Sequence, residues 1–329
     1  MTDIALRRAA EAACDCLAIS ELDDLLIVSN KDQEPIASAL AAAGAPRARS
    51  AKRLTFPSLS RHGEEPPTHV AEAMTQASVI FTPTTYSLSH TQARARATQR
   101  NARIATIGGV SEDTFKRAIG VDYVALAATS RRLARALTSA RSCRVTTPAG
   151  TDVVLVLEGR TAISDDGNLQ APGEWGNLPA GEAYISPQET RAEGTIVFDG
   201  ALAGYGLLAD PLSVTLSRGR AVSAEGEAAD WLLDTLDAGG PTGRLIAELG
   251  IGTNPAAILT GDICEDEKVI GTVHIAFGMS TSIGGANRAS VHLDGMMLQP
   301  TVELDGQPLL LAGLPAFARV HEAANVTLS

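Results

Sequence analysis

The hydrophobic pattern of this chain changes near Cys143, and that change limits the possible folds more than any other feature of the sequence. Before it, short apolar runs alternate with segments of helical pattern. The pattern predicts strands and helices in turn at residues 24–30, 34–43, 78–84, 87–100, 102–109, 111 onward and 123–141. Continuous apolar strands that alternate with helices indicate a parallel sheet with helices on both faces. We therefore expect an α/β N-terminal domain with a mostly parallel sheet.

After Cys143, branched residues alternate with turn residues, which is the pattern of antiparallel hairpins. Strand-like segments continue to residue 306, and the clear helix among them covers 228–237. We expect an α/β domain over residues 1–141 and a β-rich α+β, metal-binding domain over residues 142–329. The chain has a net charge of −11, and the acidic excess lies in the second part. Such a domain suits divalent cations, although a solubilising charge explains it equally well.

Composition and missing motifs argue against several functions. An acidic chain lacks the cationic surface that nucleic acid requires, and no apolar run is long enough to cross a membrane. The sequence contains neither a P-loop nor the nucleophile elbow of a serine hydrolase. Its four cysteines show no paired spacing, and acidic residues interrupt the first twenty positions, where a secretory signal has an apolar run. We expect a cytoplasmic protein with neither a nucleic acid nor a membrane as partner.

The acidic second part contains a set of candidate metal ligands. His292 and Asp294 lie two residues apart in a strand, so their side chains project from the same face. His274 and Glu248 stand in otherwise apolar strands, and Glu182 follows a Pro-Ala-Gly turn. A buried carboxylate without a positive partner is costly, and Lys and Arg are scarce in this part. The spacing leaves two interpretations open, a metal site or scattered structural polar residues.

Four ordered motifs carry a resemblance to a known family. NLPAGEAYISP, AELGIGTNP, DEKVIGTVHIAFG and GGANRASVHLDG together resemble the thermophilic-type metalloaminopeptidases, the group of aminopeptidases T and S. The resemblance implies a homodimer whose C-terminal domain carries two divalent metal ions, namely Zn²⁺, Co²⁺ or Mn²⁺. The family's metal-binding positions fall on the five candidate ligands: Glu182, Glu248, His274, His292 and Asp294.

One position departs from the aminopeptidase pattern. Those enzymes carry a Tyr seven residues after the histidine that aligns with His274, and this chain has Thr281. A threonine hydroxyl is too short to reach the same oxyanion. The sequence also resembles a related branch that shares this fold, the 2,5-dihydroxypyridine 5,6-dioxygenases, which use one Fe²⁺ ion. His274, His292 and Asp294 match the two histidines and one aspartate of that site.

Our leading hypothesis from the sequence is a two-metal aminopeptidase that removes N-terminal residues from small peptides with a metal-activated water. Glu182 and Glu248 are the candidate catalytic residues, and which of them is the general base stays open. The alternative is a mononuclear Fe²⁺ ring-cleaving dioxygenase with a small-molecule substrate. A third possibility is a metal-binding scaffold without activity. The acidic run at 265–267 is expected to be a solvated loop.

Overall fold

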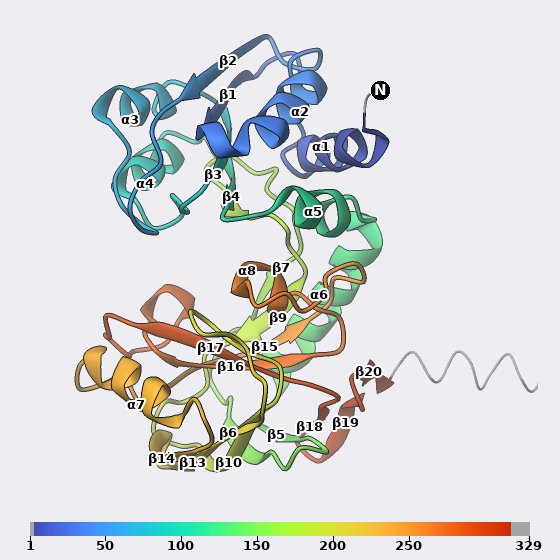
Figure 1. Cartoon of the computed structure of the whole chain (residues 1–329). Helices are drawn as coiled ribbons and strands as arrows, with labels where there is room; N and C mark the ends of the chain where they lie inside the picture. The colour runs from blue at the N-terminus through green and yellow to red at the C-terminus, as the bar shows by residue number, and fades with distance from the viewer. Residues whose placement is uncertain (1–2, 317–329) are drawn as a thin grey trace, which may run out of the picture. The chain divides into compact units, whose positions relative to one another are not determined.

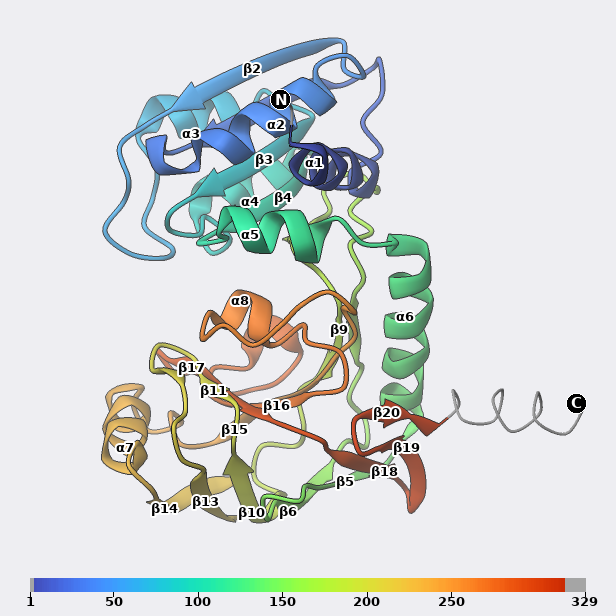
Figure 2. The same cartoon turned by 45° about the vertical axis from the view of Figure 1, so that its right-hand side comes forward.

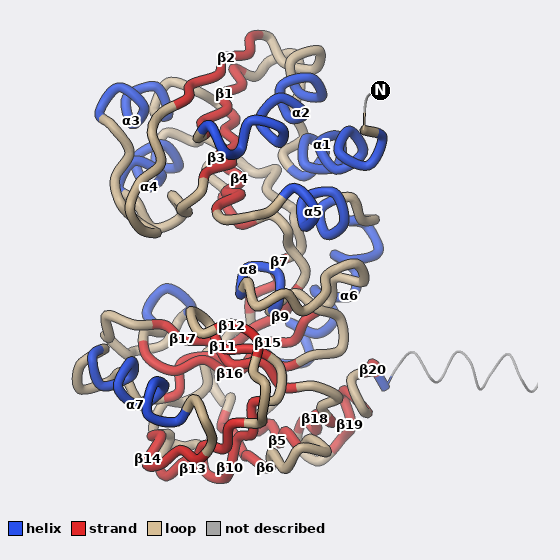
Figure 3. Tube along the Cα trace, viewed as in Figure 1, coloured by secondary structure: helices blue, strands red, loops and turns tan. Residues whose placement is uncertain are grey.

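The computed structural model describes residues 3–316, and these residues form two compact units. The first unit contains the chain up to Ala127 together with 165–180 and 255–257, and the second contains 128–164, 181–254 and residues from 258 onward. Figure 3 shows most of the helices in the first unit and most of the strands in the second. The domain prediction places a single cut at 141/142, whereas the chain re-enters the first unit because 175–177 adds a strand to its sheet.

The first unit is built on a parallel sheet with the strand order β2-β1-β3-β4-β8. Its strands are β1 (Asp24–Ser29), β2 (Ser50–Thr55), β3 (Val79–Thr84), β4 (Arg103–Gly108) and β8 (Trp175–Asn177). Its helices are α1 (Ile4–Cys16), η1 (Lys31–Gln33), α2 (Glu34–Gly44), α3 (Thr68–Met74), α4 (Gln92–Gln99), α5 (Glu112–Thr114) and the π-helical η2 (Phe115–Ile119). The longer α6 (Tyr123–Ser139) follows them, and from residue 128 onward it belongs to the second unit.

Helices cover both faces of this sheet, as Figure 1 shows. Leu25 and Ile27 of β1 pack in a core with α1, α2 and η2. The alternate residues Leu26 and Val28 pack in a second core with α3 and α4. Successive side chains of a strand point to opposite faces, so a strand buried on both faces must be apolar throughout. The predicted parallel α/β domain is confirmed.

Two elements of the first unit escape the hydrophobic pattern. The edge strand β2 has the sequence SAKRLT and is almost entirely exposed, so it carries no apolar run. Helix α1 is amphipathic but buries alanine and cysteine rather than large aliphatic residues, and it was not among the predicted elements. The helix expected after Ser111 begins as α5 and continues as the π-turn η2.

The second unit contains two sheets that pack face to face. The first has the strand order β14-β13-β10-β6-β5-β18-β19-β20 and the second has the order β12-β11-β17-β16-β15-β9-β7. The strands of the first sheet are β5 (Ser142–Thr146), β6 (Asp152–Val156), β10 (Glu193–Phe198), β13 (Leu212–Ser217), β14 (Arg220–Glu225), β18 (Thr301–Leu304), β19 (Gln307–Leu311) and β20 (Leu314–Pro315). The strands of the second are β7 (Ile163–Asp165), β9 (Glu182–Ile185), β11 (Ala201–Leu202), β12 (Gly206–Leu207), β15 (Ile246–Gly252), β16 (Val273–Gly278) and β17 (His292–Met297).

A single apolar core fills the space between these two sheets. Phe198 of β10 and Phe277 of β16 meet edge to face across it, with ring centroids 6.5 Å apart. The helix α7 (Ala229–Ala238) adds Leu232 and Leu236 to the same core. The short helix α8 (Ile263–Asp266) lies on the other side of the second sheet, in both Figure 1 and Figure 2. The predicted β-rich α+β domain is confirmed.

None of the helices within residues 3–316 combines the length and the apolar character needed to span a bilayer.

Candidate metal centre

Four neighbouring strands of the second sheet present the five predicted ligands on one face. Glu182 is on β9, Glu248 on β15, His274 on β16, and His292 with Asp294 on β17. The residues that alternate with them in these strands belong to the apolar core: Ala183, Leu249, Val273, Ile275 and Leu293. Strand alternation therefore directs the ligands away from the core.

A β-bulge places Glu248 on this face. The pairing of β15 with β16 shifts between Ile246 and Glu248. Ile246 packs in the apolar core, and in a regular strand a residue two positions later would lie on the same face. The extra residue of the bulge reverses the alternation, so the carboxylate of Glu248 lies on the outer face with the histidines.

A glycine gives His274 the space that it occupies. Gly250 is the register partner of His274 on β15. A Cβ atom added at Gly250 would lie 2.0 Å from His274 Nε2, so the imidazole crosses directly over the backbone of this residue. This close approach lets His274 reach Glu182 on the far side of β15.

The polar atoms form a connected cluster. His274 Nε2 lies 3.2 Å from Glu182 Oε2 and 3.4 Å from Glu248 Oε1. Glu248 Oε2 lies 3.4 Å from His292 Nε2, which is 3.5 Å from Asp294 Oδ2. Glu248 therefore links the two imidazoles. His274 is fully buried, whereas the side chain of His292 is 29% exposed, so solvent reaches the cluster at His292.

The charges of the cluster shift the ionisation of its members. Burial opposes ionisation of Glu248, but hydrogen bonds from His274 and His292 outweigh it and lower the Glu248 pKa to about 2. Burial likewise disfavours the charged imidazoles. The surrounding carboxylates outweigh it and raise the pKa values of His274 and His292 well above the ordinary value.

Two members of the cluster, Lys268 and Glu267, were not among the predicted site residues. Lys268 is 1% exposed, and its ammonium group contacts Glu182 and lies 2.8 Å from Glu267 Oε1. The inference that the buried carboxylates lack a cationic side chain was therefore wrong for Glu182. Lys and Arg are scarce in this part of the chain, and the sequence does not indicate that one of the few lysines is buried among the acidic side chains.

The acidic run at 265–267 is not a solvated loop. Glu265 and Asp266 are buried, and their carboxylates accept hydrogen bonds from the backbone N–H groups of Ile258, Thr260 and Gly261. These bonds hold the 258–261 segment against α8. They also position the turn that delivers Lys268 into the cluster.

Two groups of side chains could each hold a metal ion: Glu248 with His292 and Asp294, and Glu182 with Glu267 and His274. Asp294 Oδ1 is buried and has no hydrogen-bond partner among residues 3–316. His292 Nδ1 lies 2.7 Å from the carbonyl oxygen of Met279, which selects the tautomer that leaves Nε2 free to bind a metal. An unpartnered carboxylate oxygen beside such an imidazole fits a divalent cation.

The sequence model of a family described as 2,5-dihydroxypyridine 5,6-dioxygenase (NicX) matches residues 18–315. The chain belongs to this dioxygenase family. A curated 2,5-dihydroxypyridine 5,6-dioxygenase of Pseudomonas putida is 27% identical to it over 191 residues, which is 54% of this chain and 55% of the relative. The chain thus matches about half the length of that relative.

Two solved structures share the fold. The 2,5-dihydroxypyridine dioxygenase of Pseudomonas putida KT2440 superposes with a TM-score of 0.79 and 19% identity, covering 94% of this chain and 96% of the other. AmpT of Thermus thermophilus gives a TM-score of 0.68 and 20% identity, covering 95% and 99%. At these identities the likeness shows a common fold and does not by itself indicate the activity.

These comparisons correct the leading hypothesis from the sequence. The resemblance to aminopeptidases reflects the shared fold, whereas the family match assigns the chain to the dioxygenase branch. The aminopeptidase, hydrolase and protease interpretations were therefore wrong. Thr281, which departs from the aminopeptidase tyrosine, is exposed in the short helix η3 (Thr281–Ile283).

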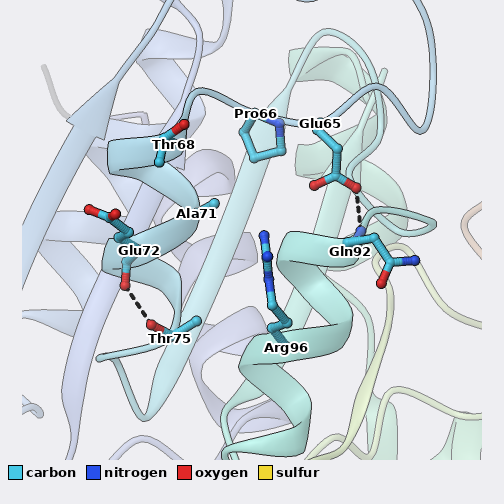
Figure 4. Close-up of a pocket in the computed structure, with 8 residues that line it drawn as sticks. All are labelled: Glu65, Pro66, Thr68, Ala71, Glu72, Thr75, Gln92 and Arg96. Atoms are coloured by element: carbon cyan, nitrogen blue, oxygen red, sulfur yellow. Dashed lines mark hydrogen bonds between the residues drawn. The ribbon is translucent and has the colours of Figure 1, made fainter.

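A separate hollow of about 530 Å³ lies in the first unit between α3 and α4. Figure 4 shows Arg96 extending into it from α4, with Glu72 and Thr75 on the α3 side. Glu65 on its rim accepts hydrogen bonds from the backbone N–H groups of Gln92 and Ala93. The polar contacts drawn there cap helices, and the hollow contains none of the predicted site residues.

Proposed function

We propose that this chain is an iron(II)-dependent dioxygenase that opens the ring of a dihydroxylated pyridine. The observation that carries the proposal is the family match over residues 18–315, which includes every strand that bears the metal cluster. His274, His292 and Asp294 supply two imidazoles and one carboxylate, the ligand set of non-haem iron(II) oxygenases. His292 and Asp294 lie in one of the two ligand groups and His274 in the other, and Glu248 contacts both imidazoles. When bound, iron(II) would supply a redox-active centre with open positions for substrate and dioxygen.

The charge of the cluster favours one divalent ion over two. Glu182, Glu248 and Asp294 provide three carboxylates, and Lys268 provides one ammonium group. Lys268 contacts both Glu182 and Glu267, so its ammonium group already balances part of the negative charge without a metal ion.

The side chains of the cluster orient one another. The Met279 carbonyl fixes the ring of His292 through Nδ1, and Gly250 leaves room for the ring of His274. Glu248 contacts both imidazoles through Nε2, so it holds the rings at a fixed spacing. The 29% exposure of His292 makes its side of the cluster the approach for a small ring.

Oxygen consumption tests the proposal directly. Protein loaded with iron(II) under argon is mixed with 2,5-dihydroxypyridine and air-saturated buffer. We expect uptake of one O₂ per substrate molecule and loss of the pyridine absorbance, without hydrolysis of aminoacyl nitroanilides. Absence of uptake by protein shown by elemental analysis to contain iron would overturn the proposal.

Replacement of one ligand tests where the iron binds. Asp294→Asn removes the charge of a buried carboxylate on β17. We expect the affinity for iron(II) to fall by at least about 100-fold, and the iron content and the oxygen uptake to fall with it. The matched control is Asp230→Asn, an exposed position in the first turn of α7. Equal iron content in the two variants would exclude Asp294 as a ligand.

A further inference from the structure

The environment of Lys268 resembles that of a metal ion more than that of an ordinary lysine. Its side chain is among the largest fully buried side chains of residues 3–316. The ammonium group contacts Glu182 and Glu267. Lysine is almost never fully buried unless it is paired, and here the ammonium group is paired with two carboxylates.

The carboxylates around Lys268 belong to a group that could itself hold a metal. Ligand atoms of Glu182, Glu267 and His274 all lie within 4.8 Å of one another. Glu182 contributes one oxygen to Lys268 and the other lies 3.2 Å from His274 Nε2. The carboxylate of Glu182 thus lies between the ammonium group and the histidine of the same group.

We propose that Lys268 replaces a second metal ion: its ammonium group contacts the carboxylates that would otherwise ligate that ion, and so limits the site to one ion. An ammonium group supplies positive charge and three hydrogen-bond donors, which satisfies two carboxylates without metal. A divalent ion beside it would meet a like charge at short range in a buried environment. Lys268 also holds Glu182 in the position from which it contacts His274.

This inference rests on the proposed function in one respect, because it takes the first ion to be held by His274, His292 and Asp294. Its test does not require turnover. Metal-free protein is titrated with Mn²⁺, the bound ions are counted by elemental analysis after equilibrium dialysis, and the electron paramagnetic resonance spectrum distinguishes isolated from exchange-coupled Mn²⁺.

We expect one Mn²⁺ per wild-type chain with the spectrum of an isolated ion. Lys268→Ala opens space and leaves Glu182 and Glu267 without their cation, so we expect two ions per chain and a coupled spectrum. Lys268→Arg keeps the charge and is expected to bind one ion. Adding Glu267→Gln to Lys268→Ala removes a ligand of the new ion and should return the count to one.

Two ions in the wild-type protein, or one ion in folded Lys268→Ala, would overturn the inference. Because an emptied cavity could prevent folding, Lys268→Gln provides a second neutral variant that loses less volume. One Mn²⁺ ion per chain in folded Lys268→Gln would also overturn the inference. The wild-type titration needs no variant. If the metal counts follow expectation while oxygen uptake is absent, the role of Lys268 stands and the proposed function fails.

Discussion

At the scale of single residues, the cluster of candidate metal ligands depends on one position without a side chain. Gly250 is the register partner of His274, and its missing Cβ leaves the space into which the imidazole extends. Its backbone does not have the positive φ that would itself require glycine. Gly250 is therefore needed for the space that it leaves open.

Gly250→Ala tests this role. The new methyl group would lie 2.0 Å from His274 Nε2, so the imidazole must move away from Glu182 and Glu248. We expect metal affinity to fall by about 10- to 100-fold, as for other changes that misplace a ligand. Isothermal titration with Mn²⁺ measures the affinity, and a urea unfolding curve verifies that the fold is retained. Unchanged affinity would show that His274 is not a ligand.

At the scale of elements, buried polar contacts fix how strands and helices of the first unit join. Asp23 precedes β1, and its carboxylate is paired with Arg103 of β4. Arg103 also donates hydrogen bonds to the carbonyl oxygens of Leu17 and Ala18, which follow α1. The side chains of Asp23 and Arg103 are only 8% and 13% exposed. Removing one partner of this pair therefore lowers the free energy of unfolding more than removing one partner of a surface ion pair.

The Asp23–Arg103 pair predicts a pH dependence of stability. Burial raises the Asp23 pKa, but hydrogen bonds from Arg103, Ser20 and Ser78 outweigh it and hold the pKa below the ordinary value. The ionised group therefore stabilises the fold above the unfolded-state pKa near 3.9, and this contribution is lost as pH falls through the folded-state pKa. Asp23→Asn should lower the free energy of unfolding at pH 7 by about 3 kcal/mol.

Urea denaturation of the wild-type protein and Asp23→Asn measures this effect. The difference between them should shrink as the pH falls below the unfolded-state pKa and through the lowered pKa of Asp23 in the folded protein. A difference that does not change with pH would mean that the charge of Asp23 does not contribute.

Helix α4 provides a second test at this scale. Glu65 accepts hydrogen bonds from the N–H groups of Gln92 (Figure 4) and of Ala93. Thr91 accepts one from the backbone N–H of Arg94. Removing a cap leaves helix N–H groups without partners, so Glu65→Ala should lower the free energy of unfolding by about 1 kcal/mol. Glu72→Ala on α3 is the control, because there the backbone carbonyl accepts the bond from Thr75. Equal unfolding midpoints for the two variants would contradict a capping role for Glu65.

At the scale of the whole molecule, the two units have separate cores and different chemistry. All the candidate metal ligands belong to the second unit. The first unit has its own apolar cores on both faces of a parallel sheet. Metal binding should therefore stabilise one unit selectively.

Hydrogen exchange measured with and without metal tests this selectivity. An ion that binds only the folded state adds roughly 2.7 kcal/mol at about 100 times its dissociation constant. With saturating Mn²⁺, we expect slower exchange in β15, β16 and β17 and unchanged exchange in β1 and β3. A chelator should reverse the change. Equal slowing in both units, or none in either, would be inconsistent with a metal site confined to the second unit.

The local pattern of the sequence predicts most elements of both units correctly. Continuous apolar runs such as 24–30 predict the buried parallel strands because both faces of those strands are covered. The alternation within VHLDG places His292 and Asp294 on one face, as the structure has them. The exposed strand β2 could not be found in this way, because it has no apolar period. The amphipathic helix α1, which buries alanine and cysteine, was not among the predicted elements.

The local pattern does not determine which charges meet. The five candidate ligands can be named from the sequence, but the bulge before Glu248, the space over Gly250 and the burial of Lys268 depend on pairing between strands distant in the chain. The choice between an aminopeptidase and a dioxygenase depended on comparison with whole families. Strand and helix patterns arise from neighbours within a few residues, whereas the balance of buried charge is a sum over groups that only tertiary folding brings together.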